Sequence, residues 1–388
     1  MTHFDFVFVG TGGAALSLLY RMLDTPELAR KRILLIDPNH QKSNDRTWCF
    51  WTDQPLPFDP IIYRRWQKLR ILSPTLDLSR QLDRLSYQMI RGEDFYAFVY
   101  ERIAACPNVE LRQTSVSQLS SDDKCAHITC QDGEQYTADW AFDSRFSYDD
   151  LGKSLTLRQH FKGWVIETES PVFDPEEVTL FDMRTPQPDG LYFFYILPFT
   201  KNRALVEYTV FSSELLTHPS NYEIPLRTYI NTQLHITDFT ILEEEFGVIP
   251  MTNHRFDRRP SPRVMTLGVA GGRAKASTGY AFLRAQRDAE SIVRALRTQK
   301  NPFYKPTFDR HFWFYDTLLL DIMYREGGLT RELFEQLFQN NPIERLLLFL
   351  DERSNFYQDL RVMASVNPQP FILSIYRLLT HQIGTKRP

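Results

Sequence analysis

The stretch Phe6-Val-Phe-Val-Gly10-Thr-Gly12-Gly-Ala-Ala15 decides the fold of the first part of the chain. Its continuous apolar run, residues 6–9, predicts a buried strand, and residues 14–23 predict a helix from their period and propensity. Glycines between such a strand and such a helix let the backbone amides at the helix N-terminus hold a pyrophosphate. Alanine in place of the third glycine is tolerated by this fingerprint, so the predicted phosphate-binding residues are Gly10, Gly12, Gly13 and Ala15.

A second apolar run, residues 33–36, predicts the next buried strand, and Asp37 follows it, 27 positions after Gly10. A carboxylate at this place accepts hydrogen bonds from the ribose hydroxyls of an adenosine. The alternative for the glycines alone is an ordinary turn, but the glycines and the acid together predict a dinucleotide site. They do not distinguish NAD from FAD.

Later segments favour FAD. Arg91 and Asp143 each follow a predicted strand, and a second glycine-rich turn, Gly268 to Gly279, lies between a strand and a helix. This recurrence suits FAD-binding folds of the glutathione-reductase kind, whereas an NAD domain would not need the chain to return after residue 260. We expect Gly271 and Gly272 to let the backbone approach a flavin ring or its ribityl phosphate, the alternative being a plain strand-to-helix turn.

The composition is that of a globular protein with ample apolar core, because 43% of the residues are hydrophobic, 24% are charged and the net charge is −3. Without an excess of positive charge, nucleic acid is not an expected partner. The four cysteines lack metal-ligand spacing, so we expect free thiols and no metal site. The first strand leaves no room for a secretory signal and no run of about 18 apolar residues occurs, so we expect a cytoplasmic chain without a transmembrane helix.

Alternating patterns predict strands at 68–73 and 80–90, a long loop at 47–60, and mainly strands from 161 to 249. Beyond Pro302, amphipathic runs predict helices at 311–325, 331–338, 343–350 and 371–381. The expected fold class is therefore α/β, a Rossmann-type FAD-binding domain with an inserted antiparallel β-sheet domain and a helical carboxyl-terminal region.

The predicted boundaries follow from these patterns. The FAD-binding domain is expected to comprise residues 1–66, 91–158 and 260–300. The β-sheet substrate domain is expected at 67–90 and 159–259, and the helical region at 301–388.

Four blocks of the sequence resemble the lycopene cyclase family in its bacterial single-subunit form. They are Asn44-Asp-Arg-Thr-Trp-Cys-Phe-Trp51, Gln159-His-Phe-Lys-Gly-Trp164, Leu205-Val-Glu-Tyr-Thr-Val-Phe211 and Lys275-Ala-Ser-Thr-Gly-Tyr280. The resemblance implies a non-covalent FAD, with Thr278 and Gly279 beside it, that NAD(P)H keeps reduced. It also implies an enzyme that converts the ends of lycopene, or of a related linear carotene, to β-ionone rings without net redox change.

Glu207 matches the glutamate of a block that is Phe-Leu-Glu-Glu-Thr in plant relatives, and the resemblance implies that it is the catalytic acid. Independently of the family, an acid between Val206 and Tyr208 on an apolar strand is expected to lose solvation, which raises its pKa and keeps a proton available at neutral pH. The alternative is a glutamate that faces solvent. As the acid, Glu207 would protonate a terminal double bond, the neighbouring double bond would attack the tertiary cation, and loss of a proton would complete the ring.

Aromatic residues are abundant and are expected either to fill the core or to line a long apolar pocket whose ring faces stabilise a cation. The candidates for the pocket wall are Trp48, Trp51, Phe194 and Tyr280. His160 and His254 are candidate proton acceptors, with a structural role as the alternative. Relatives have a histidine where this chain has Lys275, whose charge would stabilise an anionic reduced flavin.

Two other functions are compatible with the sequence. A FAD-dependent monooxygenase or isoprenoid reductase of the same fold commonly has an aspartate after the last glycine strand, where this chain has Val269. A carotenoid carrier with a vestigial flavin fold would have no reason to keep both the glycine fingerprint and Asp37. Because a C40 carotene lives in a bilayer, we also expect peripheral membrane contact through helix 371–379, with Arg377 and His381 able to face head groups; core packing of this helix is the alternative.

Overall fold

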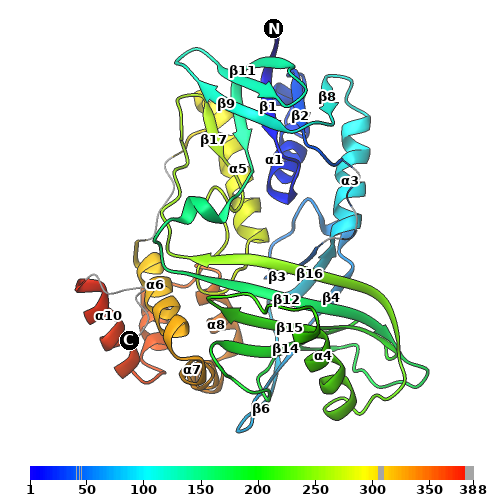
Figure 1. Ribbon diagram of the computed structural model, residues 1–388, viewed down its shortest axis with the longest axis vertical. Helices are drawn as coiled ribbons and strands as arrows, with labels where there is room; N and C mark the ends of the chain where they lie inside the picture. The colour runs from blue at the N-terminus through cyan, green and yellow to red at the C-terminus, as the bar shows by residue number, and fades with distance from the viewer. Residues whose placement is uncertain (41, 43, 45, 305–309, 381–388) are drawn as a thin grey trace.

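The structure is a computed structural model that describes residues 1–40, 42, 44, 46–304 and 310–380 (Figure 1). Two large sheets, a small third sheet and a group of carboxyl-terminal helices make up a mixed α/β fold. The first sheet lies at the end of the molecule that carries the N-terminus. The second lies at the other end, beside the carboxyl-terminal helices (Figure 1).

The first sheet has a parallel centre. In sheet order its strands are β8 (Val109–Arg112), β2 (Ile33–Ile36), β1 (Thr2–Val9), β11 (Gln135–Asp143), β10 (Ala126–Cys130) and β9 (Val116–Ser121), and β17 (Val264–Thr266) pairs with the end of β11. The strands β8, β2, β1, β11 and β17 are parallel, whereas β9, β10 and β11 form an antiparallel meander. Parallel strands are buried on both faces, which explains the continuous apolar runs of β1 and β2.

Helices pack on this sheet through a shared apolar core. The long ones are α1 (Gly13–Leu23), α3 (Gly92–Ala104) and α5 (Phe282–Gln299), and the short helical segments are α2 (Pro26–Ala29) and η2 (Tyr148–Leu151). Leu16 and Leu19 of α1, Phe95 of α3 and Ile292 of α5 are buried in one cluster with Phe8 of β1. The strand β17 and the helix α5 thus return the chain to the sheet with which it began.

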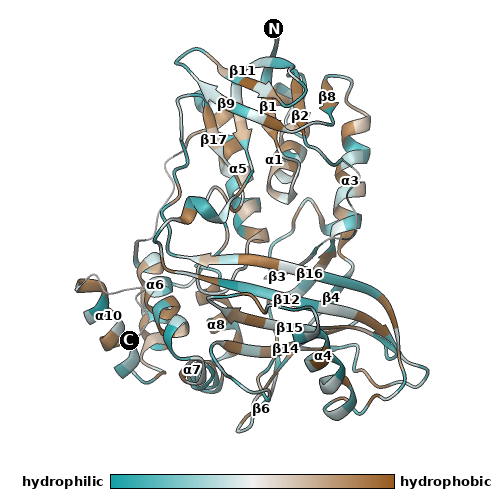
Figure 2. Cartoon of the chain, in the orientation of Figure 1, coloured by the Kyte–Doolittle hydropathy of each residue, from teal (hydrophilic) through white to brown (hydrophobic). Residues whose placement is uncertain are grey.

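The second sheet is antiparallel except for one pair. Its order is β16 (Thr240–Thr252), β12 (Thr156–Glu167), β15 (Arg203–Ser212), β14 (Leu191–Pro198), β13 (Glu177–Asp182), β5 (Lys68–Leu72) and β6 (Asp77–Gln81), and β13 and β5 are parallel. Alternate residues of a strand point to opposite faces. Both faces of its central strands are buried, one against the helix α4 (Ser220–Thr232) and the other towards the carboxyl-terminal helices, so Figure 2 shows β14 and β15 in hydrophobic colours.

The third sheet joins the two ends of the molecule. It consists of β3 (Thr47–Thr52), β7 (Ser86–Arg91) and β4 (Arg64–Trp66), and the helical turn η1 (Asp59–Ile61) precedes β4. The carboxyl-terminal helices are α6 (Arg310–Arg325), α7 (Gly327–Asn340), α8 (Ile343–Leu350), α9 (Phe356–Met363) and α10 (Gln369–Leu379). No helix in the described residues is both long and apolar enough to cross a membrane.

The structure corrects several local predictions. The prediction of a long loop at 47–60 is wrong, because its aromatic start is β3, paired with β7. The predicted strand 80–90 is parts of two strands, β6 and β7, which belong to different sheets. The helices α4 and α9 were not predicted; α4 contains Pro225, which interrupts a helical pattern between strands. The predicted end of the last helix, His381, lies outside the described residues.

Candidate active site

A cavity of about 570 Å³ lies between the first sheet, the third sheet and the inner face of the second sheet. At one end it is lined by Gly12 and Gly13, where α1 begins. At the other end it is lined by apolar side chains of α6, α7 and α8, which are Leu319, Phe334, Leu337, Phe338, Leu346, Leu347 and Leu350. The cavity therefore connects the predicted phosphate loop with an apolar compartment.

The phosphate loop has the shape that its glycines predict. A Cβ at Gly12 would meet no atom within 4 Å, whereas a Cβ at Gly13 would lie 2.8 Å from Cζ2 of Trp48. The first position is open, as a bound phosphate requires, and the second lets the Trp48 ring approach the backbone. Gly10 has a φ of +89° in the turn after β1, and Ala15 is buried in α1.

Asp37 lies beside this loop but not on the cavity wall. Its Oδ2 accepts hydrogen bonds from the Thr11 amide at 2.7 Å and the Thr11 hydroxyl at 2.9 Å, while its Oδ1 accepts from the Asn39 amide and the Lys42 ammonium. Burial opposes ionisation, but these hydrogen bonds outweigh it and lower the pKa of Asp37. The carboxylate is thus ionised and helps to hold the loop that begins with Thr11.

The second glycine-rich turn reaches the cavity through Gly268, Thr278 and Gly279. Gly268 and Gly279 have positive φ angles of +58° and +72°, which a side chain would strain. Gly271 and Gly272 do not line the cavity: a Cβ at Gly271 would lie 2.7 Å from the Thr266 carbonyl oxygen, so close packing within the turn accounts for it. Arg91 lies outside the cavity too; it pairs with Asp94 and Glu93 and covers the ring of Tyr63.

Three buried polar atoms on the cavity wall have no hydrogen-bond partner among the described residues: Gln159 Oε1, Thr278 Oγ1 and Gln286 Oε1. Buried polar groups are normally hydrogen bonded, so such atoms indicate a ligand that supplies the missing partners. They lie on β12, in the turn before α5, and on α5 itself. The space between the phosphate loop and the second sheet therefore fits a polar, nucleotide-like group.

Glu207 lies on β15 with its side chain on the cavity wall, and only 7% of the residue is exposed. The Thr209 hydroxyl donates a hydrogen bond to Glu207 Oε1 at 2.5 Å. Burial, followed by the nearby Glu245, raises the pKa of Glu207 well above its usual value. The side chain is thus a buried carboxylic acid, and the solvent-facing alternative is wrong.

Several neighbours of Glu207 were not predicted from the sequence. Glu245 of β16 lies next to it, and Tyr195 of β14 is paired with it in the sheet. The Tyr195 hydroxyl is 2.6 Å from the Tyr87 hydroxyl, which is 3.1 Å from that of Tyr280. These three tyrosines line the cavity, and burial raises the pKa of each, so they are neutral hydroxyl groups at neutral pH. No local pattern signals the cluster, because its members come from three separate segments.

Trp48, Trp51 and Tyr280 line the cavity, but the prediction that Phe194 does so is wrong. Phe194 points to the other face of β14, where it stacks on Tyr229 of α4 with ring centroids 3.7 Å apart. Its neighbours Phe193 and Tyr195 line the cavity instead. The error follows from the period of two along a strand, which places successive side chains on opposite faces.

Neither candidate histidine lines the cavity. His160 is fully buried on the α4 side of the second sheet, with Nε2 2.8 Å from the Ser212 hydroxyl and Nδ1 2.7 Å from the Tyr222 hydroxyl. His254 Nδ1 is 2.9 Å from the Ser154 hydroxyl. Both therefore have the structural role that was the alternative.

Lys275 is buried and its ammonium is bound by carboxylates. Its Nζ donates to Asp316 of α6 at 2.9 Å and to Glu352, which follows α8, at 3.0 Å. Lys275 does not line the cavity. Its charge thus ties the glycine-rich turn to the carboxyl-terminal helices, in place of the predicted contact with a flavin.

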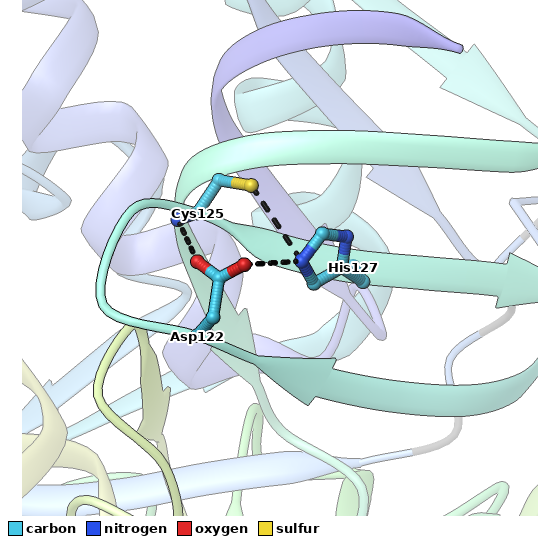
Figure 3. A group of neighbouring side chains, drawn as sticks. All are labelled: Asp122, Cys125 and His127. Carbon is cyan, nitrogen blue, oxygen red and sulfur yellow. Dashed lines mark hydrogen bonds and ion pairs between the residues drawn. The ribbon is translucent and has the colours of Figure 1, made fainter.

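Asp122, Cys125 and His127 form the one group of metal-ligand side chains found among the described residues (Figure 3). It lies in the hairpin between β9 and β10, away from the cavity lining. Asp122 Oδ1 accepts from the amides of Lys124 and Cys125, and Oδ2 lies 3.1 Å from His127 Nε2. Hydrogen bonds that close the hairpin account for this arrangement.

The fold resembles solved flavoprotein structures over nearly the whole chain. A geranylgeranyl bacteriochlorophyll reductase-like protein from Thermoplasma acidophilum is 12% identical, with a TM-score of 0.60 over 97% of this chain and 100% of that one. A flavoprotein/dehydrogenase from Cytophaga hutchinsonii is 11% identical, with a TM-score of 0.60 over 98% and 100%. PqsL from Pseudomonas aeruginosa, described as a probable FAD-dependent monooxygenase, is 13% identical, with a TM-score of 0.55 over 90% and 100%. At these identities the likeness shows the fold alone, and no curated protein matches the chain.

The four blocks that carry the family resemblance meet at the cavity. Trp48 of the first block, Gln159 of the second, Glu207 of the third and Thr278 of the fourth all lie on its wall, although they are far apart in the sequence. Residues 5–377 match the family described as "Lycopene cyclase protein". This match extends over nearly the whole chain, and the chain belongs to the lycopene cyclase family.

Proposed function

We propose that the chain is a lycopene β-cyclase, which converts the linear ends of lycopene to β-ionone rings and so forms γ-carotene and then β-carotene. The observation that carries this proposal is Glu207, a buried acid with a raised pKa on the wall of an apolar, aromatic cavity. Protonation of an alkene needs a carboxylic acid that is shielded from water. Desolvation raises the pKa of such an acid, so that it is still protonated at neutral pH. Substrate and product share one formula, so the reaction consumes no hydride.

FAD is the cofactor that we propose for the polar end of the cavity. The amides of Gly12 and Gly13 at the N-terminus of α1 would hold the pyrophosphate, and the unpartnered atoms of Gln159, Thr278 and Gln286 would bind polar groups of the cofactor. Bound FAD, kept reduced by NAD(P)H, would supply an electron-rich ring beside the cationic substrate. The open position at Gly12 fits this assignment, and so does the flavoprotein fold of the chain.

Glu207 would start the reaction by giving its proton to the terminal double bond of one end of the carotene. A C–H bond forms, and the remaining tertiary cation is attacked by the neighbouring double bond, which closes the six-membered ring. Loss of a proton from the ring restores a double bond. Throughout these steps the positive charge stays on the substrate, and the carboxylate of Glu207 stays close to it as counter-charge.

Aromatic side chains surround the place where the charge develops. Trp51, Phe193, Tyr195, Phe211 and Tyr280 line the same cavity as Glu207, and Tyr195 is its partner on the neighbouring strand. Each ring face near a cation contributes about 0.5–2 kcal/mol, and rings also exclude the water that would trap the cation as an alcohol. The apolar side chains from α6, α7 and α8 would hold the hydrocarbon chain of the substrate.

We also propose that the chain contacts a membrane peripherally. Exposed apolar side chains concentrate in the last two helices: Phe356, Tyr357 and Leu360 in α9, and Ile372, Leu373, Ile375, Tyr376 and Leu379 in α10. Their burial in the head-group region would bring the apolar end of the protein to the bilayer that contains the carotene. Arg377 would not face head groups, because it pairs with the buried Asp321 of α6 at 2.6 Å.

Anaerobic turnover tests the proposed function. The protein is loaded with FAD, reduced, mixed with lycopene in liposomes, and the carotenoids and the flavin spectrum are measured over many turnovers. We expect γ-carotene and β-carotene to accumulate while the flavin stays reduced. Consumption of NADPH in proportion to product would instead indicate a reductase or monooxygenase, and a flavin-loaded protein that leaves lycopene unchanged would contradict the cyclase.

A further inference from the structure

Glu207 and Glu245 lie in one row across three neighbouring strands. Gly163 of β12 is paired with Glu207 of β15 on one side and with Glu245 of β16 on the other. A Cβ at Gly163 would lie 3.0 Å from Cγ and 3.2 Å from Oε1 of Glu245. Because glycine has no side chain there, the Glu245 side chain folds over the strand between them towards Glu207, close enough for its charge to raise the pKa of Glu207.

Each carboxyl group of the pair accepts a hydrogen bond from one threonine hydroxyl. The Thr47 hydroxyl of β3 donates to Glu245 Oε2 at 2.7 Å, and the Thr209 hydroxyl donates to Glu207 Oε1. Glu245 Oε1 is buried and receives no hydrogen bond from a donor group of the described residues. Two buried carboxylates so close together repel each other, so one of them is expected to keep a proton, for which Glu245 Oε1 is a free acceptor.

We propose that Glu245 is the positioning residue of the catalytic acid: it shares a single proton with Glu207 and keeps that proton on the cavity wall between turnovers. This inference rests on the proposed function. Burial raises the pKa of both glutamates, and Thr209 and Thr47 each lower the pKa of the one to which they donate. The pKa of Glu207 is raised well above its usual value, which leaves the proton on Glu207, the member of the pair that lines the cavity.

The proton balance of the cycle closes within the pair. When Glu207 gives its proton to the alkene, its O–H bond breaks, a C–H bond forms, and the pair gains one negative charge while the substrate gains one positive charge. When the ring loses a proton, a different C–H bond breaks, on a carbon next to the ring cation; its electrons form the new double bond, and the proton returns to the pair. Two adjacent carboxylates repel each other, so the pair is a stronger base at that moment than a lone carboxylate would be. No oxidant, reductant or further proton donor is needed.

Among the residues that the structure describes, Glu243, Cys49 and Tyr280 are the other titratable groups that act on the pair or feel its charge. The charge of Glu243 of β16 raises the pKa of Glu245. Glu243 itself accepts hydrogen bonds from Arg203 of β15 and from Asn44. Cys49 of β3, with Tyr280 of the turn before α5, is close enough to feel the charge of Glu207, and burial raises the pKa of both groups, so both are neutral at neutral pH. Lys42 and Arg46 line the same cavity. The burial that raises the pKa of Glu207, and after it the charge of Glu245, supports the assignment of the proton.

The pH dependence of Glu245→Gln tests the role. The amide removes the neighbouring negative charge and can donate to Glu207, so the pKa of Glu207 should fall and activity should disappear at a lower pH than in the native protein. We expect kcat/KM to be near native at about pH 6 and to fall at about pH 8 by about tenfold for each unit of lowered pKa. Glu244→Gln is the matched control, because Glu244 is exposed and pairs with Lys162 on the other face of β16. An equal loss at both pH values, or an unchanged profile, would overturn the proposal.

Two further variants keep the test decisive if Glu245→Gln does not fold. Gly163→Ala changes no charge but forces Glu245 away from Glu207, so it should shift the profile in the same direction. Glu245→Asp keeps a carboxyl group and should retain the native profile at reduced rate. If Gly163→Ala kept the native profile in a folded protein, the pairing would have no role.

An infrared measurement separates this proposal from the proposed function, because it needs no substrate. The native protein should show, at neutral pH, the C=O stretch of a protonated carboxyl group that is absent in Glu207→Gln. The band should disappear in Glu245→Gln at neutral pH, return on acidification, and persist in Glu244→Gln. A band that persists in Glu245→Gln at neutral pH would show that Glu207 does not depend on Glu245 for its proton, and the proposal would be wrong. A band that behaves as expected in a protein that does not cyclise lycopene would leave the pair intact and refute the cyclase.

Discussion

At the scale of single residues, the chemistry of the site depends on side chains whose surroundings change their ordinary acidity. Glu207 is buried, so its neutral form is favoured, and the nearby charge of Glu245, which has the same sign, favours that form further. Asp37 has a similar degree of exposure but receives four hydrogen bonds, so its ionised form is favoured. Two buried carboxyl groups thus have opposite charge states because of their hydrogen-bond partners.

Replacement of Glu207 by glutamine should abolish most activity while leaving the fold and the cofactor in place. The amide keeps the shape of the side chain but has no proton of suitable acidity, so general-acid catalysis should fall by roughly 10²–10⁴-fold. Glu207→Asp should lose less, because the proton is kept and only its position changes. The rates of lycopene cyclisation and the flavin content of the purified variants are the measurements. Native rates in Glu207→Gln would mean that another group is the acid.

His160 should make the fold sensitive to acid. Burial lowers its pKa from the usual 6.5 to about 4, so the unfolded chain binds a proton in this range that the folded chain does not. The free energy of unfolding should therefore fall as the pH falls from about 6.5 towards 4, by roughly 3 kcal/mol at most. Urea denaturation at a series of pH values measures this slope. His160→Gln should flatten it, whereas the same change at the exposed His218 should not; equal slopes in both variants would contradict the assignment.

At the scale of secondary-structure elements, the two faces of the second sheet have different roles, because successive side chains of a strand point to opposite faces. Residues of β14 and β15 that face α4 build a core cluster, and those that face the other way line the cavity. Neighbouring phenylalanines of β14 therefore have different roles although both are buried.

Phe193→Leu and Phe194→Leu form a matched pair that tests this separation. Both remove an aromatic ring from a buried site, so both should lower the free energy of unfolding, by less than the about 3–5 kcal/mol of truncation to alanine. Only Phe193→Leu should raise the KM for lycopene or alter the product ratio, because only Phe193 lines the cavity. Steady-state kinetics and chemical denaturation give the two quantities. A change in KM confined to Phe194→Leu would reverse the assignment of the two faces.

The loop between β1 and α1 should tolerate a larger side chain only when no cofactor is present. Gly12→Val adds a side chain where the structure has open space, so the thermal unfolding of the flavin-free variant should match that of the flavin-free native protein. The same side chain would occupy the place proposed for the pyrophosphate, so flavin should not be retained. The flavin absorbance of the purified protein measures this, and full flavin content would show that the phosphate site lies elsewhere.

At the scale of the whole molecule, the cavity runs from the glycine turn between β1 and α1 to helices that lie next to the exposed apolar side chains of the carboxyl-terminal region. The helix α10 contacts α6, whose Leu319 lines the cavity. The buried ion pairs of Lys275 join the glycine-rich turn to the same helical region. These contacts connect the glycine-rich turn at the polar end of the cavity to the helices at its apolar end.

Membrane contact should depend on α10 and not on apolar exposure in general. Ile372 of α10 and Ile224 of α4 are 61% and 64% exposed, so a change to glutamate has a similar effect on the surface at either place. We expect Ile372→Glu, but not Ile224→Glu, to reduce flotation with liposomes. Equal flotation of both folded variants and the native protein would remove the proposed role of α10.

Much of the site could be predicted from the sequence because its signals are local. The glycine loop, Asp37 and the apolar runs of β1 and β2 each lie within a few residues, where turn geometry and hydrophobic period act directly. The burial of Glu207 follows from its place between Val206 and Tyr208. The order of the four blocks along the chain is enough to indicate the family, without knowledge of which residues meet in space.

The remaining features depend on which strands become neighbours, and no local pattern carries that information. Glu245 meets Glu207 only because β16 and β15 pair with β12 in the register that puts Gly163 between them. The loss of Phe194 from the cavity wall and the burial of His160 against α4 depend on which face of the sheet α4 covers. The sequence determined the strands β1 and β2, the glycine turn between β1 and α1 and the burial of Glu207, since these follow from neighbouring residues. Tertiary structure alone decided which side chains meet that acid, because strand register and the faces of a sheet are set by packing between distant segments.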